Sequence, residues 1–343
     1  MILKSRVFSL ALLLAIALIT PGVLKAQDTQ PMSEVSLGSG STSTGGKTSG
    51  GESLMGGSVD GLDGSTGDVT STAPASNGGP EAVTFDGTYV WIATQFSDSV
   101  IRVRASDRTL AGTFTVGKRP VALLYAAGYI WVANLLSDNV TKLNPATGAV
   151  AGTYAAGDGP GGLAFDGTSL WIANRDGNTV TKMSTSGAIK GTFPVGDRPI
   201  GVAIAANSVW ITNNFSNSVT RLSLSGALLG TYPVGKGAFG VARQGDNVLV
   251  TNYFGKTVTR LRAADGFNLG EFKVGDGASG IMFDGTYVWV VNNGDSTLMK
   301  LTADGAIVTT YATGKGPFSV AYDGTKVWVP NFASNSVSTT AAN

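Results

Sequence analysis

Short apolar runs alternate with turn residues from about residue 80 onward, and this pattern recurs every 39 or 40 residues. The tryptophans mark the period best. All of them occupy the same place in the repeat, and one further position carries leucine: Trp91, Trp131, Trp171, Trp210, Leu249, Trp289 and Trp328. Seven equivalent units are therefore predicted.

Each unit contains four short β-rich runs separated by turn signals. In the third unit, the Asp166-Gly167 and Ser186-Gly187 turns separate runs at residues 163–165, 170–174, 180–183 and 191–195. Four strands per unit are typical of a propeller blade. The predicted fold is thus all-β, a seven-bladed β-propeller of four-stranded antiparallel blades with essentially no helix. We expect the tryptophans to pack between blades rather than to bind a ligand.

The last unit, residues 317–343, has only three predicted strands. A missing outer strand would leave a sheet edge unpaired, which folded proteins avoid. The segment Val69–Ala75 precedes the first unit and is expected to supply the fourth strand beside the C-terminal one. An N-terminal strand would then close the ring, and the propeller would comprise residues 69–343.

The N-terminus has the layout of a secretory signal peptide over residues 1–26. Lys4 and Arg6 precede an apolar run over residues 7–20, which Pro21 and Gly22 end before the small residue Ala26. The alternative is a membrane anchor, but spanning needs about 20 apolar residues. We therefore expect an exported protein, periplasmic, at the cell surface or extracellular, with no membrane span after cleavage.

A linker is predicted over residues 27–68, because 22 of the 30 residues from 38 to 67 are Gly, Ser or Thr. Such a composition cannot bury enough apolar surface to fold. A glycosylated or cell-wall spacer is the alternative. The chain has no cysteine, which excludes disulfides, thiolate metal sites and a lipoprotein anchor.

The second-strand motif points to a known family. Its copies at residues 89–92, 209–213 and 248–252 resemble the YVTN-repeat β-propellers, and residues 80–340 also look similar to virginiamycin B lyase-like propellers. The YVTN resemblance implies seven blades, bacterial export and binding roles that sometimes involve DNA. The lyase-like resemblance implies a histidine general base and a divalent metal, and propeller lactonases hold a metal at the tunnel mouth.

The residues present favour a binding module over an enzyme. The chain has no histidine, which argues against lyase chemistry. Glu81 is the only acid at the start of an inner strand, and one carboxylate is a poor metal site. No catalytic residue, metal or cofactor is therefore predicted. The alternative is a propeller enzyme of the lyase or lactonase type with a tunnel-mouth metal.

Residues that break the repeat are better candidates for recognition than residues that maintain it. The loops after the second strand and before the first should share one face. Large side chains there make up the predicted ligand-binding rim: Phe96, Arg119, Arg175, Phe215, Tyr253, Phe254 and Phe332. Exposed rings can stack on a ligand, although scattered surface aromatics also occur without one.

The charge pattern limits the partners. Without residues 1–26 the chain keeps 21 Lys and Arg against 23 Asp and Glu, and its loop charges are mixed in sign. The repeated third-strand cations are expected to be solvated. Nucleic-acid binding requires a clustered basic face, so we do not expect a nucleic-acid partner. We expect the protein to be a monomer that binds a glycan, a peptide or another protein.

Overall fold

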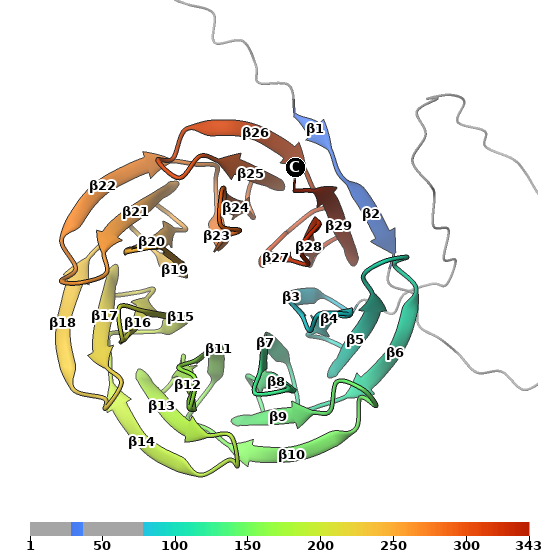
Figure 1. Ribbon diagram of the computed structural model, residues 1–343, viewed down its shortest axis with the longest axis horizontal. Helices are drawn as coiled ribbons and strands as arrows, with labels where there is room; N and C mark the ends of the chain where they lie inside the picture. Colours follow the sequence, from blue (N-terminus) through green and yellow to red (C-terminus); the bar gives the residue numbers. More distant parts are fainter. Residues whose placement is uncertain (1–28, 37–77, 343) are drawn as a thin grey trace, which may run out of the picture.

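The computed structural model describes residues 29–36 and 78–342, which form a ring of seven β-sheets around a central channel (Figure 1). Every regular element in these two ranges is a β-strand. Among these same residues there is consequently no long apolar helix able to cross a membrane. The predicted seven-bladed propeller is confirmed.

Each blade runs from an inner strand at the channel to an outer strand at the periphery. The first three blades comprise β3 Pro80–Phe85, β4 Tyr89–Thr94, β5 Ser99–Arg104 and β6 Leu110–Thr115; β7 Pro120–Ala126, β8 Tyr129–Asn134, β9 Asn139–Leu143 and β10 Val150–Ala155; and β11 Pro160–Phe165, β12 Ser169–Asn174, β13 Thr179–Ser184 and β14 Ile189–Pro194. The next two comprise β15 Pro199–Ala205, β16 Ser208–Asn213, β17 Ser218–Ser223 and β18 Leu228–Pro233; and β19 Ala238–Gln244, β20 Asn247–Asn252, β21 Thr257–Arg262 and β22 Asn268–Lys273.

The last two blades differ from these five because N-terminal strands join them. Blade 6 comprises β23 Ala278–Phe283, β24 Val288–Asn292, β25 Thr297–Leu301 and β26 Ile307–Ala312, and β1 Gln30–Pro31 pairs parallel to β26. Blade 7 comprises β27 Ala321–Tyr322, β28 Lys326–Asn331, β29 Ser336–Ala341 and, as its outer strand, β2 Ser33–Ser36.

A local hydrogen-bond pattern explains why the Asp-Gly turn comes five residues before tryptophan. In blade 3, one carboxylate oxygen of Asp166 accepts the backbone N–H groups of Thr168 and Ser169, and the other accepts the indole N–H of Trp171 at 2.8 Å. Three other tryptophans donate to an equivalent aspartate. One aspartate therefore both closes the hairpin turn and orients the indole.

The tryptophans form the layer between blades, as predicted. All six are at most 1% exposed. Trp131 of blade 2, for example, packs on Leu170 and Ile172 of blade 3, and Trp328 of blade 7 packs on Val90 of blade 1. Each blade thus buries apolar surface against the next one around the whole ring.

The third-strand cations link adjacent blades, so the prediction that they are solvated is wrong. Lys182 lies 5.1 Å above the Trp171 ring and donates to the Leu224 carbonyl of the next blade at 2.6 Å. Lys300 repeats this arrangement toward Ala342 and is only 5% exposed. The indole face and the neighbouring carbonyl offset the desolvation of the ammonium group.

Ring closure confirms one prediction and corrects another. An N-terminal strand does pair with the C-terminal one, but it is β2, in register Ser33 to Thr339 through Ser36 to Ser336. The segment Val69–Ala75, like the predicted signal peptide over 1–26, lies outside the described residues. The Gly, Ser and Thr content of residues 27–68 predicts a linker, but the short segment around Met32 forms strands, and the Met32 side chain packs on the core between blades 6 and 7.

We predict that removing residues 1–36 destabilises the propeller by roughly 2–5 kcal/mol, whereas removing residues 1–28 leaves its stability unchanged. The longer deletion removes the hydrogen bonds of β2 and the burial of Met32. Urea unfolding of the two truncated chains measures the difference. Equal stabilities would show that another segment, such as Val69–Ala75, can take the place of β2.

We further predict that Trp171→Phe costs about 1–3 kcal/mol more stability than Trp210→Phe. The first substitution leaves Asp166 without its indole donor, whereas the buried Trp210 Nε1 has no hydrogen-bond partner among the described residues. Both remove a similar volume from the inter-blade layer, so packing losses largely cancel in the comparison. Chemical unfolding of both variants tests this, and equal losses would contradict it.

Candidate functional site

The two sets of loops that carry the predicted rim are tied together at one end of the channel. In six blades, the residue after the second strand donates its backbone N–H to the carbonyl of the residue before the first strand, and in blade 7 the acceptor is Gly316, before the Pro317 bridge. Arg175 donates to Gly159 at 2.8 Å, Asn214 to Arg198 at 3.0 Å, and the other five blades repeat this bond. The prediction that these loops share one face is confirmed.

A cavity of about 630 Å³ opens at this end of the channel, which we call the mouth. Six of the seven predicted rim residues line it: Arg119, Arg175, Phe215, Tyr253, Phe254 and Phe332. Phe96 does not line the cavity, but its ring packs on Phe332 at 5.2 Å. The structure therefore brings all the predicted rim residues to the mouth or directly beside it.

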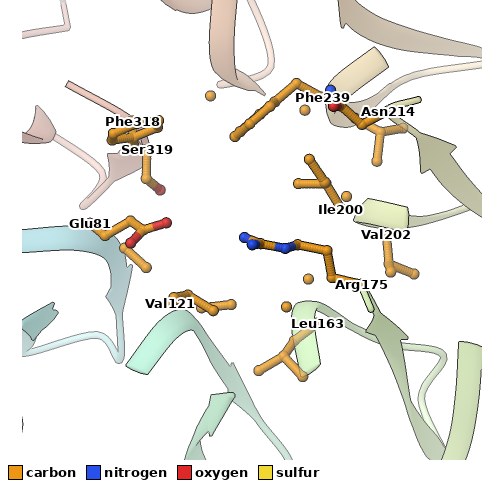
Figure 2. Close-up of a pocket in the computed structure, with 18 of the residues that line it drawn as sticks. Glu81, Val121, Leu163, Arg175, Ile200, Val202, Asn214, Phe239, Phe318 and Ser319 are labelled. Atoms are coloured by element: carbon orange, nitrogen blue, oxygen red, sulfur yellow. The ribbon is translucent and has the colours of Figure 1, made fainter. Parts of the chain in front are cut away.

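The repeat-based selection missed side chains from the start of the inner strands. Phe239 and Phe318 point into the channel in Figure 2, as do Val121 and Ile200. The residue type at this position changes from blade to blade, and two copies are phenylalanine, a signal that the sequence contains.

One side of the mouth is a continuous series of aromatic rings, here called the aromatic arc. Consecutive ring centroids lie 5.2 to 6.3 Å apart in the order Phe254, Tyr253, Phe239, Phe318, Phe332 and Phe96. At these separations rings stack or meet edge to face. Phe254 and Phe96 remain 65% and 59% exposed, so the arc offers apolar surface to a ligand.

The other side of the mouth carries three arginines from blades 2, 3 and 4. Arg119 and Arg198 precede inner strands, and Arg175 follows a second strand. Arg198 stacks on Phe215 at 4.6 Å from its ring centroid. Burial and the nearby charge of Arg175 lower the pKa of Arg198, and Asp176 offsets only part of this effect. Arg175 and Arg198 therefore repel each other on this side of the mouth.

Within residues 29–36 and 78–342, Glu81 is the single acidic residue that lines the cavity. Figure 2 shows its carboxylate facing the guanidinium of Arg175, which reaches into the centre of the channel. The Gln95 amide donates a hydrogen bond to this carboxylate. Burial raises the pKa of Glu81 to about 7, although Arg119, Arg175 and the hydrogen bond lower it. Glu81 is therefore partly protonated near neutral pH.

This arrangement can bind a molecule by stacking and by charge. Across residues 29–36 and 78–342, no three His, Cys, Asp or Glu side chains converge as metal ligands would. A hard cation at the mouth would find one carboxylate, that of Glu81, and the neighbouring guanidinium groups would repel the cation. The chemistry on offer is thus π-stacking, apolar contact and arginine hydrogen bonding.

Comparisons with known proteins identify the fold. No family model matches the chain, and no curated protein matches its sequence. Among solved structures, virginiamycin B lyase from Staphylococcus aureus is 17% identical, with a TM-score of 0.70 over 78% of this chain and 96% of that one. Kuenenia stuttgartiensis hydrazine synthase is 19% identical, with a TM-score of 0.71 over 80% of this chain and 99% of that one.

A third similar structure is BamB from Moraxella catarrhalis, 17% identical, with a TM-score of 0.56 over 76% of this chain and 83% of that one. A lyase, a hydrazine synthase and BamB all resemble this chain in fold at 17–19% sequence identity. The likeness therefore shows the propeller fold, and the function has to be argued from the mouth.

We predict that Glu81→Gln is more stable than the parent protein above pH 7, by at most about 3 kcal/mol, and equally stable below pH 4.5. Because the native pKa is near 7 and the ordinary value is 4.5, the parent loses stability as pH rises between these values. Glutamine cannot ionise and avoids this loss. Urea unfolding at pH 4.5 and pH 8 measures the effect.

The matched control is Asp304→Asn, which removes a carboxylate that is 93% exposed in its ion pair with Arg260. This variant should follow the parent at both pH values within a few tenths of a kcal/mol. If Glu81→Gln proves less stable than the parent at pH 8, the arginines stabilise the ionised carboxylate more than burial disfavours it.

Proposed function

We propose that this chain is an exported, non-catalytic β-propeller that binds a ligand at the mouth of its central channel. The ligand is a glycan, a peptide or a segment of a protein, and the propeller acts as a monomeric binding or scaffold module. Nucleic acid is not the expected partner. Export rests on the charged and apolar pattern of residues 1–26.

One observation carries the binding proposal, namely the composition of the cavity wall. A concave site of a few hundred Å³ with aromatic walls and a few polar anchors is the usual form of a small-ligand site. The mouth combines a cavity of about 630 Å³ with the aromatic arc and three arginines. The opposite end of the channel lies beside the Asp-Gly hairpin turns, whose aspartates are engaged in the fold.

A propeller enzyme of the lyase or lactonase type is the second candidate, and Glu81 is the observation that favours it. A buried carboxyl with a pKa near 7 can take up a proton at physiological pH. Virginiamycin B lyase shares the fold. The chain has no histidine, and the described part of the chain places no second acidic residue along the cavity wall. Both observations favour binding without turnover.

We predict that Phe215→Ala or Tyr253→Ala weakens binding of the ligand found by glycan and peptide array screening by roughly 1–3 kcal/mol, and that Phe215→Ala does so without lowering the melting temperature appreciably. Phe215 is 60% exposed and borders the cavity, so its removal takes away ligand contact but little core. Calorimetric titration of each variant with the array ligand measures the loss.

Phe267→Ala is the matched control for Phe215→Ala. Phe267 is 59% exposed and has Arg262 stacked on it, but it lies in the turn before β22, away from the mouth. Binding that responds to Phe267 and not to Phe215 would contradict the site. Opening of lactones or cyclic esters that needs divalent metal and disappears in Glu81→Gln would instead establish the enzyme.

A further inference from the structure

The residue before each inner strand has the same backbone conformation in six blades, and Gly316, before the Pro317 bridge that precedes β27, shares it in the seventh. Its φ lies between 53° and 74°, the left-handed region, in every copy. Five copies are glycine, which adopts this conformation without steric cost: Gly79, Gly159, Gly237, Gly277 and Gly316. The other two are Arg119 and Arg198, with φ of 57° and 53°.

The structural role of this position is performed by its backbone alone. Its carbonyl accepts the bond that ties the two loops together, at 2.9 Å for Arg119 and 2.8 Å for Gly159. Its N–H donates to a side chain of the preceding blade, at 2.8 Å for both Arg119 and Arg198 and 2.7 Å for Gly237. Nothing in the ring therefore calls for a side chain here.

Arginine at this position costs backbone strain that glycine avoids in the other five blades, whereas the loop before the third strand has a non-glycine residue at positive φ in every blade. Strained residues that the fold does not need are concentrated at functional sites. Both side chains line the cavity, as does Arg175. Two carboxylates oppose these three guanidinium groups: Glu81 in the wall is partly protonated near pH 7, and Asp176 pairs with Arg175 at 3.5 Å. The mouth thus carries excess positive charge.

One donor near this charge lacks a partner within the described residues. Nε of Arg119 is buried and has no acceptor. Buried polar atoms without partners are uncommon in folded proteins, so each one calls for an explanation. An acceptor atom of a ligand would complete this donor, which favours the arginine side of the mouth for the polar end of the ligand.

We propose that the ligand is a carboxylate with an apolar or aromatic body, whose anionic end is held by Arg119, Arg175 and Arg198 while its body packs on the aromatic arc. This inference rests on the proposed function and names the ligand class. A guanidinium matches the planar carboxylate with paired hydrogen bonds. Glu81 in the same wall disfavours a dianion. A free organic acid and the C-terminus of a peptide share this chemistry.

The test uses matched pairs that differ only in charge. The probes are N-acetyl-phenylalanine, 4-phenylbutanoate and the peptide Ala-Ala-Ala-Phe, each as the free acid and as the terminal amide. Isothermal titration of the full-length chain should show at least tenfold tighter binding of the acids. A stronger acid preference for the peptide than for the two small acids would identify a chain terminus as the source, and the reverse a free acid.

The decisive variant is Arg119→Gly combined with Arg198→Gly, because it installs the residue that the other five blades use. It should lower the affinity for the acids at least tenfold, abolish the preference over the amides, and leave the melting temperature equal or higher. Arg243→Gln, which removes an exposed cation at the far end of β19, should leave binding unchanged.

Three outcomes would overturn the inference. If acids and amides bind equally and Phe239→Leu weakens both, the mouth binds ligands but charge does not select them, so the proposed function stands without this ligand class. If acids bind tightly but the glycine double variant binds them as well, the arginines are not the anchor. If no probe binds while an array ligand responds to Phe215→Ala, the ligand belongs to another class.

Discussion

An indole sandwiched between two sheets is the contact on which this ring depends. Each second-strand tryptophan lies against the apolar second strand of the next blade, and at five of them a third-strand cation lies over the ring. A blade alone cannot cover both of its faces, so stability requires neighbours on both sides. The last blade must therefore meet the first, and β2 completes its sheet by pairing with β29.

The same repetition determines where the site can form. Seven inner strands converge on one channel, and close packing of neighbouring blades constrains their backbones. A side chain on Gly201 or Gly280 would come within 2.8 Å of the carbonyl oxygen of Phe239 or Phe318 in the next blade. Large side chains instead occur where an inner strand begins or just after a second strand ends, as Arg119, Glu81 and Tyr253 do.

The mouth is asymmetric although the ring is nearly symmetric. Arginines from blades 2 to 4 face rings supplied mainly by blades 5 and 7, and no structural requirement of the repeat explains either group. An apolar surface opposite excess positive charge suits a ligand with two chemically different ends. The fold shared with virginiamycin B lyase and hydrazine synthase says nothing about that ligand, because the departures from the repeat carry the recognition.

The sequence by itself determined the number of blades, the inter-blade role of the tryptophans and the face on which repeat-breaking side chains gather, because a period of 39 or 40 residues and its exceptions are local patterns. Only the tertiary structure decided which N-terminal segment closes the ring, since pairing β2 with β29 joins residues about 300 positions apart. It also revealed that the third-strand cations bridge blades and that Glu81 lies opposite Arg175. Both depend on distances between separate repeats, and no spacing within one repeat encodes them.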